Sequence, residues 1–161
     1  MDSKQTLGTL LRNLVDRLDH AVEQSYRDDG LDYRPRFTPV VRALSALGPS
    51  SITTLAQHIG MRHSAVSQTV AQMQRQGLVG YESGADARER LVVPSAALAN
   101  MIPRLEKHWS ATNKAAEALE DTLPHPLTPV LIAALEALDD EDFAARIARH
   151  FNAALKDGET P

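Results

Sequence analysis

Residues 51–94 carry the pattern that most restricts the fold: two short helical segments joined by a tight turn and followed by a hairpin. In both segments apolar residues recur at three- and four-residue steps, which is the spacing of one buried helix face. They are Ile52, Leu55, Ala56 and Ile59 in the first segment and Val66, Val70 and Met73 in the second, which runs from about Ser64 to Gln76. Ser51 is placed to cap the first helix, and the tight connection Gly60-Met61-Arg62-His63 leads into the second.

A β-hairpin is predicted directly after the second helix, which Gly77 closes. Its flanks, residues 78–82 and 88–93, are short and rich in β-branched or aromatic side chains, and a polar tip that contains glycine separates them. Pro94 ends the second strand, and Ser95 can cap the next helix. Two short helices joined by a glycine-containing turn and followed by such a hairpin are the parts of a winged helix-turn-helix with a two-stranded wing.

Helical patterns on both sides make the chain mainly α. Leu7, Leu11, Leu14 and Leu18 form an N-terminal stripe, and residues 96–121 form a long stretch that Pro103 is expected either to kink or to begin. A winged helix needs only about 65 residues, so the flanking stripes cannot all be buried on it. We therefore predict an N-terminal dimerisation helix over residues 1–32, a winged-helix lobe over residues 33–97 and a C-terminal helical dimerisation region over residues 98–161.

The charge of the chain is divided by region. The formal net charge of −4 is made up of −3 for residues 1–32, +4 for residues 33–95 and −5 for residues 96–161. No acidic residue lies between Tyr33 and Tyr81. A basic central region between two acidic segments indicates a polyanionic partner. The alternative is that these charges only solvate the surface.

Composition and motifs narrow the functional class. The 161 residues contain no cysteine, which excludes disulfides, thiolate zinc sites and cysteine nucleophiles. The six histidines form no convincing pair at helical ligand spacing, so we expect no metal site and no cofactor. No phosphate-binding loop, nucleophile elbow, zinc-protease motif or dinucleotide fingerprint is present, so we expect no enzyme. Without a signal peptide or a transmembrane run, a cytoplasmic protein with no membrane partner is expected.

The outward face of the second helix is suited to a DNA groove. With its apolar residues buried, this helix presents small or hydrogen-bonding side chains and no acid. Such a face can enter the major groove, which is about 12 Å wide. The candidate DNA contacts of this helix and of its approach are Arg62, His63, Ser64, Ser67, Gln68, Gln72 and Arg75. Gln68 and Gln72 are expected to read adenine edges, and His63 is expected to contact phosphate. A plain surface helix is the alternative interpretation.

The predicted wing carries three further candidate contacts. Arg88 lies near the tip, with Arg90 two residues later and Asp86 two residues earlier. A guanidinium on a narrow hairpin suits a minor groove, where the negative potential attracts it. Asp86 is close enough in sequence to pair with Arg88 and fix its direction, although an ordinary exposed ion pair is the alternative.

Residues 51–95 resemble the MarR (multiple antibiotic resistance regulator) family of transcription factors. The matching pieces are Leu55-Ala56, Ile59-Gly60, Val66-Ser67, Gly77-Leu78-Val79 and the wing segment Asp86-Ala87-Arg88-Glu89-Arg90-Leu91-Val92. The wing segment is similar to the Asp-x-Arg signature of the family. Two departures are clear: Pro94-Ser95 stands where the family usually has Leu-Thr, and Arg62 replaces the usual Ser or Thr cap, which leaves Ser64 as the substitute.

The resemblance implies a homodimer that binds double-stranded DNA at a near-palindromic operator and acts as a ligand-controlled repressor. It also implies a pocket between the dimer helices and the DNA-binding lobe for an aromatic or lipophilic small molecule. The candidate lining residues are Tyr26, Tyr33, Phe37, Met101, His108 and Trp109. For each of them an ordinary core or interface residue is the alternative, and the more common, interpretation. The competing function is a helical protein-interaction module whose winged helix no longer reads DNA; the acid-free, arginine-rich middle argues against it.

Overall fold

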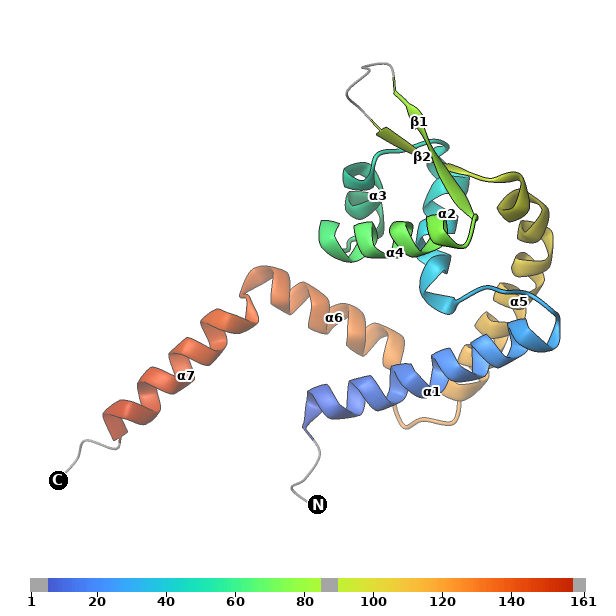
Figure 1. Cartoon of the computed structure of the whole chain (residues 1–161). Helices are drawn as coiled ribbons and strands as arrows, with labels where there is room; N and C mark the ends of the chain where they lie inside the picture. The colour runs from blue at the N-terminus through green and yellow to red at the C-terminus, as the bar shows by residue number, and fades with distance from the viewer. Residues whose placement is uncertain (1–5, 85–89, 158–161) are drawn as a thin grey trace. The chain divides into compact units, whose positions relative to one another are not determined.

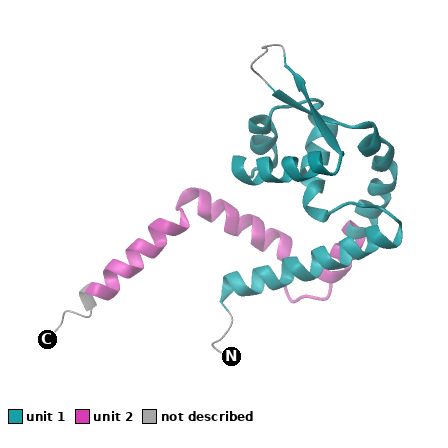
Figure 2. Ribbon diagram, viewed as in Figure 1, with its two compact units in different colours: residues 1–112 teal, residues 113–161 magenta. Residues whose placement is uncertain are grey.

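A computed structural model describes residues 6–84 and 90–157 of the chain (Figure 1). The elements follow in the order α1 (Leu7–Asp28), the 3-10 helix η1 (Pro35–Phe37), α2 (Thr38–Leu47), α3 (Ile52–Ile59), α4 (His63–Arg75), β1 (Val79–Ser83), β2 (Arg90–Pro94), α5 (Ala96–Glu120), α6 (Leu127–Asp140) and α7 (Phe143–Asp157). The chain divides into two compact units, residues 1–112 and residues 113–161 (Figure 2). The predicted mainly α fold with a two-stranded wing is confirmed, and the three-part division by role stays a prediction.

The first unit is built around one apolar core below the hairpin (Figure 1). The inward residues predicted for α4, Val66, Val70 and Met73, are at most 1% exposed. They pack with Leu55 of α3 and with other fully buried side chains, which come from η1, α2, β2 and α5. The predicted helical spacing therefore identified the buried faces of the helix-turn-helix correctly.

Local signals at the helix ends also match the sequence. The Ser51 hydroxyl accepts a hydrogen bond from the Thr54 N–H at 3.2 Å, and the Ser95 hydroxyl accepts one from the Leu98 N–H at 3.2 Å. Gly60 adopts the left-handed conformation, with φ of +74°, at the end of α3. A side chain with a Cβ is strained in this conformation, so glycine allows the tight turn that leads into α4.

One expectation about a helix end was wrong, and one of two alternatives for another is excluded. Ser64 does not cap α4, because Arg62 already has the extended backbone of an N-cap and Ser64 lies inside the first turn; Arg62 makes no side-chain capping hydrogen bond. Pro103 does not begin α5, which starts at Ala96. Pro103 has no N–H to donate to the carbonyl of Ala99, four residues earlier, and both residues are exposed.

The wing is joined to the helices through Ser50. Strands β1 and β2 pair antiparallel, with Tyr81 opposite Val92 and Ser83 opposite Arg90. Ser50, just before α3, exchanges two backbone hydrogen bonds with Val92, at 2.8 and 3.3 Å. Because Val92 is fully buried, these bonds fix the base of the hairpin against the helix-turn-helix.

Large apolar side chains remain exposed on α1 and in the second unit. On α1 they are Leu7, Leu10, Leu11, Val15 and Leu18. On α6 and α7 they are Val130, Leu131, Ile132, Leu135, Leu138, Phe143, Ile147, Phe151 and Leu155. Contiguous exposed apolar surface of this kind marks an interaction site in soluble proteins. Among the helices that the structure describes, none is long and apolar enough to cross a membrane.

Candidate nucleic-acid interface

The exposed face of α4 carries the side chains that the sequence singled out. Arg62 and His63, at the start of the helix, and Ser64, Gln68 and Arg75, along it, are exposed. Ser67 and Gln72 are half-buried at the edges of the same face. The seven candidate contacts of this helix therefore lie together on the surface of one element.

The electrostatics of this face favour an anionic partner. The first turn of α4 contains no acidic residue, and its last turn contains Arg75. Free backbone N–H groups and the positive end of the helix dipole attract phosphate at a helix N-terminus. The guanidinium of Arg62 and the imidazole of His63 stand at this end, so the approach to α4 is suited to a phosphate backbone.

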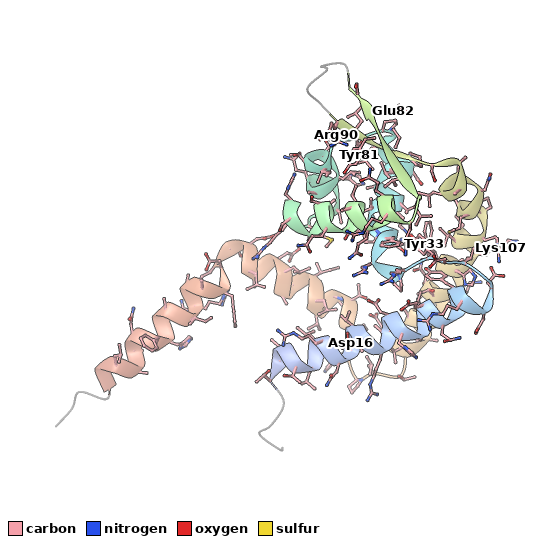
Figure 3. All side chains as sticks on the ribbon, in the orientation of Figure 1. Asp16, Tyr33, Tyr81, Glu82, Arg90 and Lys107 are labelled. Atoms are coloured by element: carbon pink, nitrogen blue, oxygen red, sulfur yellow. The ribbon has the colours of Figure 1, made fainter. Side chains whose placement is uncertain are left out.

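The described part of the wing holds one of the three predicted contacts in a defined position. Arg90 lies on β2, and its Cζ is 4.1 Å from the centroid of the Tyr81 ring on β1 (Figure 3). A cation over an aromatic face is held there electrostatically. Asp86 and Arg88 lie outside the described residues, so their predicted roles stay predictions.

Five of the six residues predicted to line an effector pocket pack together in or against the core, and the sixth, His108, contacts them and also borders an open cavity. The Tyr26 and Tyr33 rings meet edge to face with centroids 5.2 Å apart, and Tyr33 meets Phe37 in the same way at 5.7 Å. These three side chains are at most 2% exposed. The His108 ring meets Tyr26 at 5.2 Å, while Met101 and Trp109 pack half-buried against the core. The rings fill the space between them, and burial raises the pKa of the Tyr33 hydroxyl.

A polar network beside this cluster was not predicted. The Ser25 hydroxyl is 2.8 Å from His108 Nδ1, and His108 Nε2 is 3.1 Å from Asp29 Oδ2. Arg104 Nη2 is 2.9 Å from Asp29 Oδ1. These residues border an open cavity of about 600 Å³ between the end of α1 and the middle of α5. The sequence could not reveal the network, because Asp29 and Arg104 are 75 positions apart and neither belongs to a recognisable motif.

This network has the residue types of a serine-hydrolase triad but not its arrangement. In such triads the carboxylate contacts Nδ1 and the serine contacts Nε2, whereas here Ser25 contacts Nδ1 and Asp29 contacts Nε2. Asp29 is also paired with Arg104, which lowers its ability to support a charged imidazole. The geometry therefore assigns the network to joining α1 with α5.

Replacing Asp29 with asparagine is expected to lower the melting temperature near neutral pH and to flatten the acid side of the stability profile. Hydrogen bonds from Arg104 and then His108 lower the pKa of Asp29 to about 2. Its pKa in the unfolded chain is about 3.9, so the carboxylate stabilises the fold above about pH 4 and this stabilisation is lost as the pH falls toward 2. Thermal melts between pH 2 and 7 measure the effect. Asp28→Asn, which keeps an acceptor for the Gln24 amide, is the control; identical profiles for both variants would contradict the role of Asp29.

Comparison with known proteins shows which of them this chain resembles. Residues 38–89 match the model of the MarR family, while no curated protein sequence matches the chain. The fold is similar to a MarR family transcriptional regulator from Silicibacter pomeroyi, with 26% identity over 82% of this chain and 94% of that one and a TM-score of 0.58.

Two other solved structures share the fold. The transcriptional regulator MOSR of M. tuberculosis, solved in complex with DNA, is 20% identical over 84% of this chain and 97% of its own, with a TM-score of 0.64. The PcaV regulator of Streptomyces coelicolor, solved with its natural ligand, is 18% identical over 88% of this chain and 96% of its own, with a TM-score of 0.62. The family match spans α2 to the wing, which are the elements that carry the candidate interface. Over residues 38–89 the chain is thus similar to the MarR family.

Proposed function

We propose that this protein is a sequence-specific DNA-binding transcriptional regulator, a homodimeric repressor that a small ligand releases from a near-palindromic operator. The observation that carries the proposal is the exposed face of α4, which has hydrogen-bonding and basic side chains, no acid, and a two-stranded wing beside it. An α-helix with such a face fits the major groove. The structure of the related MOSR protein with DNA supports the same use of the fold.

Different contacts have different roles in this proposal. Arg62, His63 and Arg75 hold phosphates and supply affinity that is independent of sequence. Gln68 reads adenine through its exposed amide, and Ser64 and Ser67 contact phosphate or base. The Oε1 atom of Gln72 is buried, so Gln72 can contribute only through its amide N–H groups at the edge of this face. On the wing, Arg88 enters the minor groove with Asp86 directing it, and Arg90 supports the same groove contact.

The homodimer is supported by the exposed apolar stripes. The apolar residues of α6 and α7 are mostly about half exposed, for example Leu135 at 64% and Phe151 at 63%. A second copy of the chain would remove both this surface and the α1 stripe from water, as obligate dimer interfaces do. Two-fold symmetry then places two recognition helices about one DNA turn apart, which requires a near-palindromic operator.

Ligand control is supported by a solved structure of similar fold. PcaV was solved with its natural ligand, and a ligand that binds one arrangement of the dimer better than the other shifts the population toward it. The aromatic cluster around Tyr33 remains the predicted site for an aromatic or lipophilic effector, and the packed rings would have to separate to admit it.

Selection of binding sites from random-sequence duplex DNA at near-physiological salt tests the proposal. Enrichment of a near-palindrome with half-sites about one turn apart is the expected result. Weak, salt-sensitive binding without sequence preference would instead show that the basic middle is a generic electrostatic surface. The protein-interaction module would then be the better interpretation.

Replacing Gln68 with alanine is expected to relax the preference at one base pair in each half-site. A bidentate amide–adenine contact discriminates against the wrong base by about 1–3 kcal/mol, so the variant loses this discrimination while its affinity for unrelated DNA stays nearly constant. Competition binding with single-base variants of the selected site measures the effect. Arg75→Ala is the matched comparison on the same helix, because loss of a phosphate contact lowers affinity for all sequences and reduces the salt dependence. A uniform loss for Gln68→Ala as well would show that Gln68 only contacts phosphate.

A further inference from the structure

The two faces of the wing differ in charge. In the observed register Tyr81 is opposite Val92 and Ser83 is opposite Arg90. Because side chains alternate between the faces of a sheet, these four lie on one face. Val92 is fully buried, so this face is turned toward the core. Glu82, the one acidic residue in the described part of the hairpin, points to the opposite face. The core-facing side therefore carries a cation and no described acid.

Tyr81 and Arg90 form a pair on this face (Figure 3). They are diagonal neighbours across the two strands, a separation that aromatic and long side chains bridge. The Arg90 Cζ is 4.1 Å from the centroid of the Tyr81 ring. Tyr81 is half-buried and packs against the core, whereas Arg90 is exposed. The core thus fixes the ring, and the ring in turn orients an exposed guanidinium.

This contact leaves the hydrogen-bonding capacity of Arg90 free for a ligand. A cation over a ring is attracted by the π-electrons and does not use its N–H donors. Those donors match the oxygens of a phosphodiester, which only accept hydrogen bonds. A long side chain that is already held in one position also loses less conformational entropy when it binds. The pair therefore presents a pre-oriented donor for an anionic backbone.

The position of the pair favours a backbone phosphate over a base. Arg90 is the first residue of β2, and Tyr81 lies two positions further from the tip than Ser83, the residue opposite Arg90. Two strand positions correspond to about 7 Å. Stacking on Tyr81 therefore turns the guanidinium away from the tip and toward the base of the hairpin. If the tip enters a groove, a group nearer the base meets the sugar-phosphate backbone at the edge of that groove.

We propose that Tyr81 is a positioning residue for DNA binding, whose ring holds the Arg90 guanidinium where it binds a phosphate of the duplex. Tyr81 acts through Arg90 and does not itself contact DNA. The inference rests on the proposed DNA-binding function and adds to it a residue that no sequence motif singles out. In the competing interpretation Tyr81 only packs against the core, and Arg90 only covers its ring.

Titration of the full-length protein with duplex DNA at several salt concentrations tests the proposal. Arg90→Ala is expected to lower affinity for every duplex and to reduce the slope of log affinity against log salt by about 1. Tyr81→Leu keeps an apolar side chain but removes the ring. It is expected to weaken binding about two- to fivefold with the slope unchanged, because the charge of Arg90 remains. Tyr81→Phe keeps the ring and is expected to bind as the wild type does.

A double-mutant cycle shows whether Tyr81 acts through Arg90. Adding Tyr81→Leu to Arg90→Ala is expected to cause no further loss of affinity. Adding it to Arg75→Ala, the matched arginine variant on α4, is expected to cause the same loss as in the wild type. Melting curves check that each variant is folded. Tyr81→Met, whose flexible side chain adapts to gaps, takes the place of Tyr81→Leu if the leucine variant does not fold.

Three results would overturn the proposal: unchanged affinity in Arg90→Ala, equal losses for Tyr81→Phe and Tyr81→Leu, or a Tyr81→Leu loss that persists in Arg90→Ala. A phosphate contact acts on any sequence, so the cycle is run on an unrelated duplex as well as on the selected site. Coupling between Tyr81 and Arg90 without any enriched site would support the pair and contradict sequence-specific regulation. An enriched site without coupling would do the reverse. A protein that binds no duplex at all would overturn both.

Discussion

Replacing Ile147 and Phe151 of α7 with aspartate is expected to convert the proposed dimer into a monomer and to lower operator affinity about a hundredfold. The two side chains are one helical turn apart and are 56% and 63% exposed in the single chain. In a dimer they would be buried, and an unpaired carboxylate in an apolar interface is strongly unfavourable. A monomer reaches only one half-site and loses the gain of linked binding, which is commonly a hundredfold or more. Sedimentation equilibrium and titration of operator DNA measure the two effects.

A charge-matched variant on the same helix is the control. Asn152→Asp combined with Ala153→Asp also adds two carboxylates to α7, and both residues are exposed, but at helical spacing they lie away from the stripe that contains Phe143, Ile147 and Phe151. This variant is expected to remain dimeric. A dimer that survives Ile147→Asp with Phe151→Asp would place the interface elsewhere and remove the support that the α7 stripe gives to the proposed homodimer.

Much of the helix-turn-helix could be predicted because its signals are local. The buried positions of α4 repeat at helical spacing, the cap at Ser51 is a single side chain, and the turn at Gly60 requires one backbone conformation. Each of these follows from a few neighbouring residues. The same holds for the outward face of α4, because once Val66, Val70 and Met73 are buried, the positions that face solvent are fixed by the 3.6-residue repeat.

The remaining features depend on residues that are distant in sequence. Ser25 and Asp29 meet His108 only because the end of α1 lies beside α5, and none of these residues lies in a motif that predicts the contact. The error at Ser64 was smaller and has a local cause. A hydroxyl is the usual capping group, but Arg62 adopts the capping backbone conformation without supplying one.

The apolar stripes show a second feature that the sequence pattern alone does not determine. Leu7, Leu11 and Leu18 were expected from their spacing to face apolar surroundings, and on the single chain they are 38–71% exposed. Periodicity identifies which face of a helix avoids water, but it does not say whether the covering surface comes from the same chain or from another. That question is answered by measuring the oligomeric state, which is why the α7 variants are decisive.

Replacing Phe37 with alanine is expected to lower the free energy of unfolding by about 3–5 kcal/mol. The side chain is fully buried, and its ring packs edge to face against Tyr33 at 5.7 Å. Removing it deletes the ring and leaves a cavity that the neighbouring rings cannot easily fill. Urea denaturation at a fixed protein concentration measures the loss, since the stability of a dimer depends on concentration. Phe37→Leu keeps most of the buried volume and is the matched variant, for which we expect a clearly smaller loss.

The size of this loss also decides how the aromatic cluster around Phe37 is to be understood. If the rings are packed as a core, truncation of Phe37 lowers the free energy of unfolding by several kcal/mol. An effector can then enter only by separating the rings, and the free energy needed to separate them weakens its binding. If the rings instead line an open pocket, Phe37 already borders empty space, and its removal costs less than about 1 kcal/mol. The edge-to-face contacts among Tyr26, Tyr33 and Phe37 favour the packed core. A loss of several kcal/mol would therefore assign these rings to the core, and an effector at this site would have to separate them before it could bind.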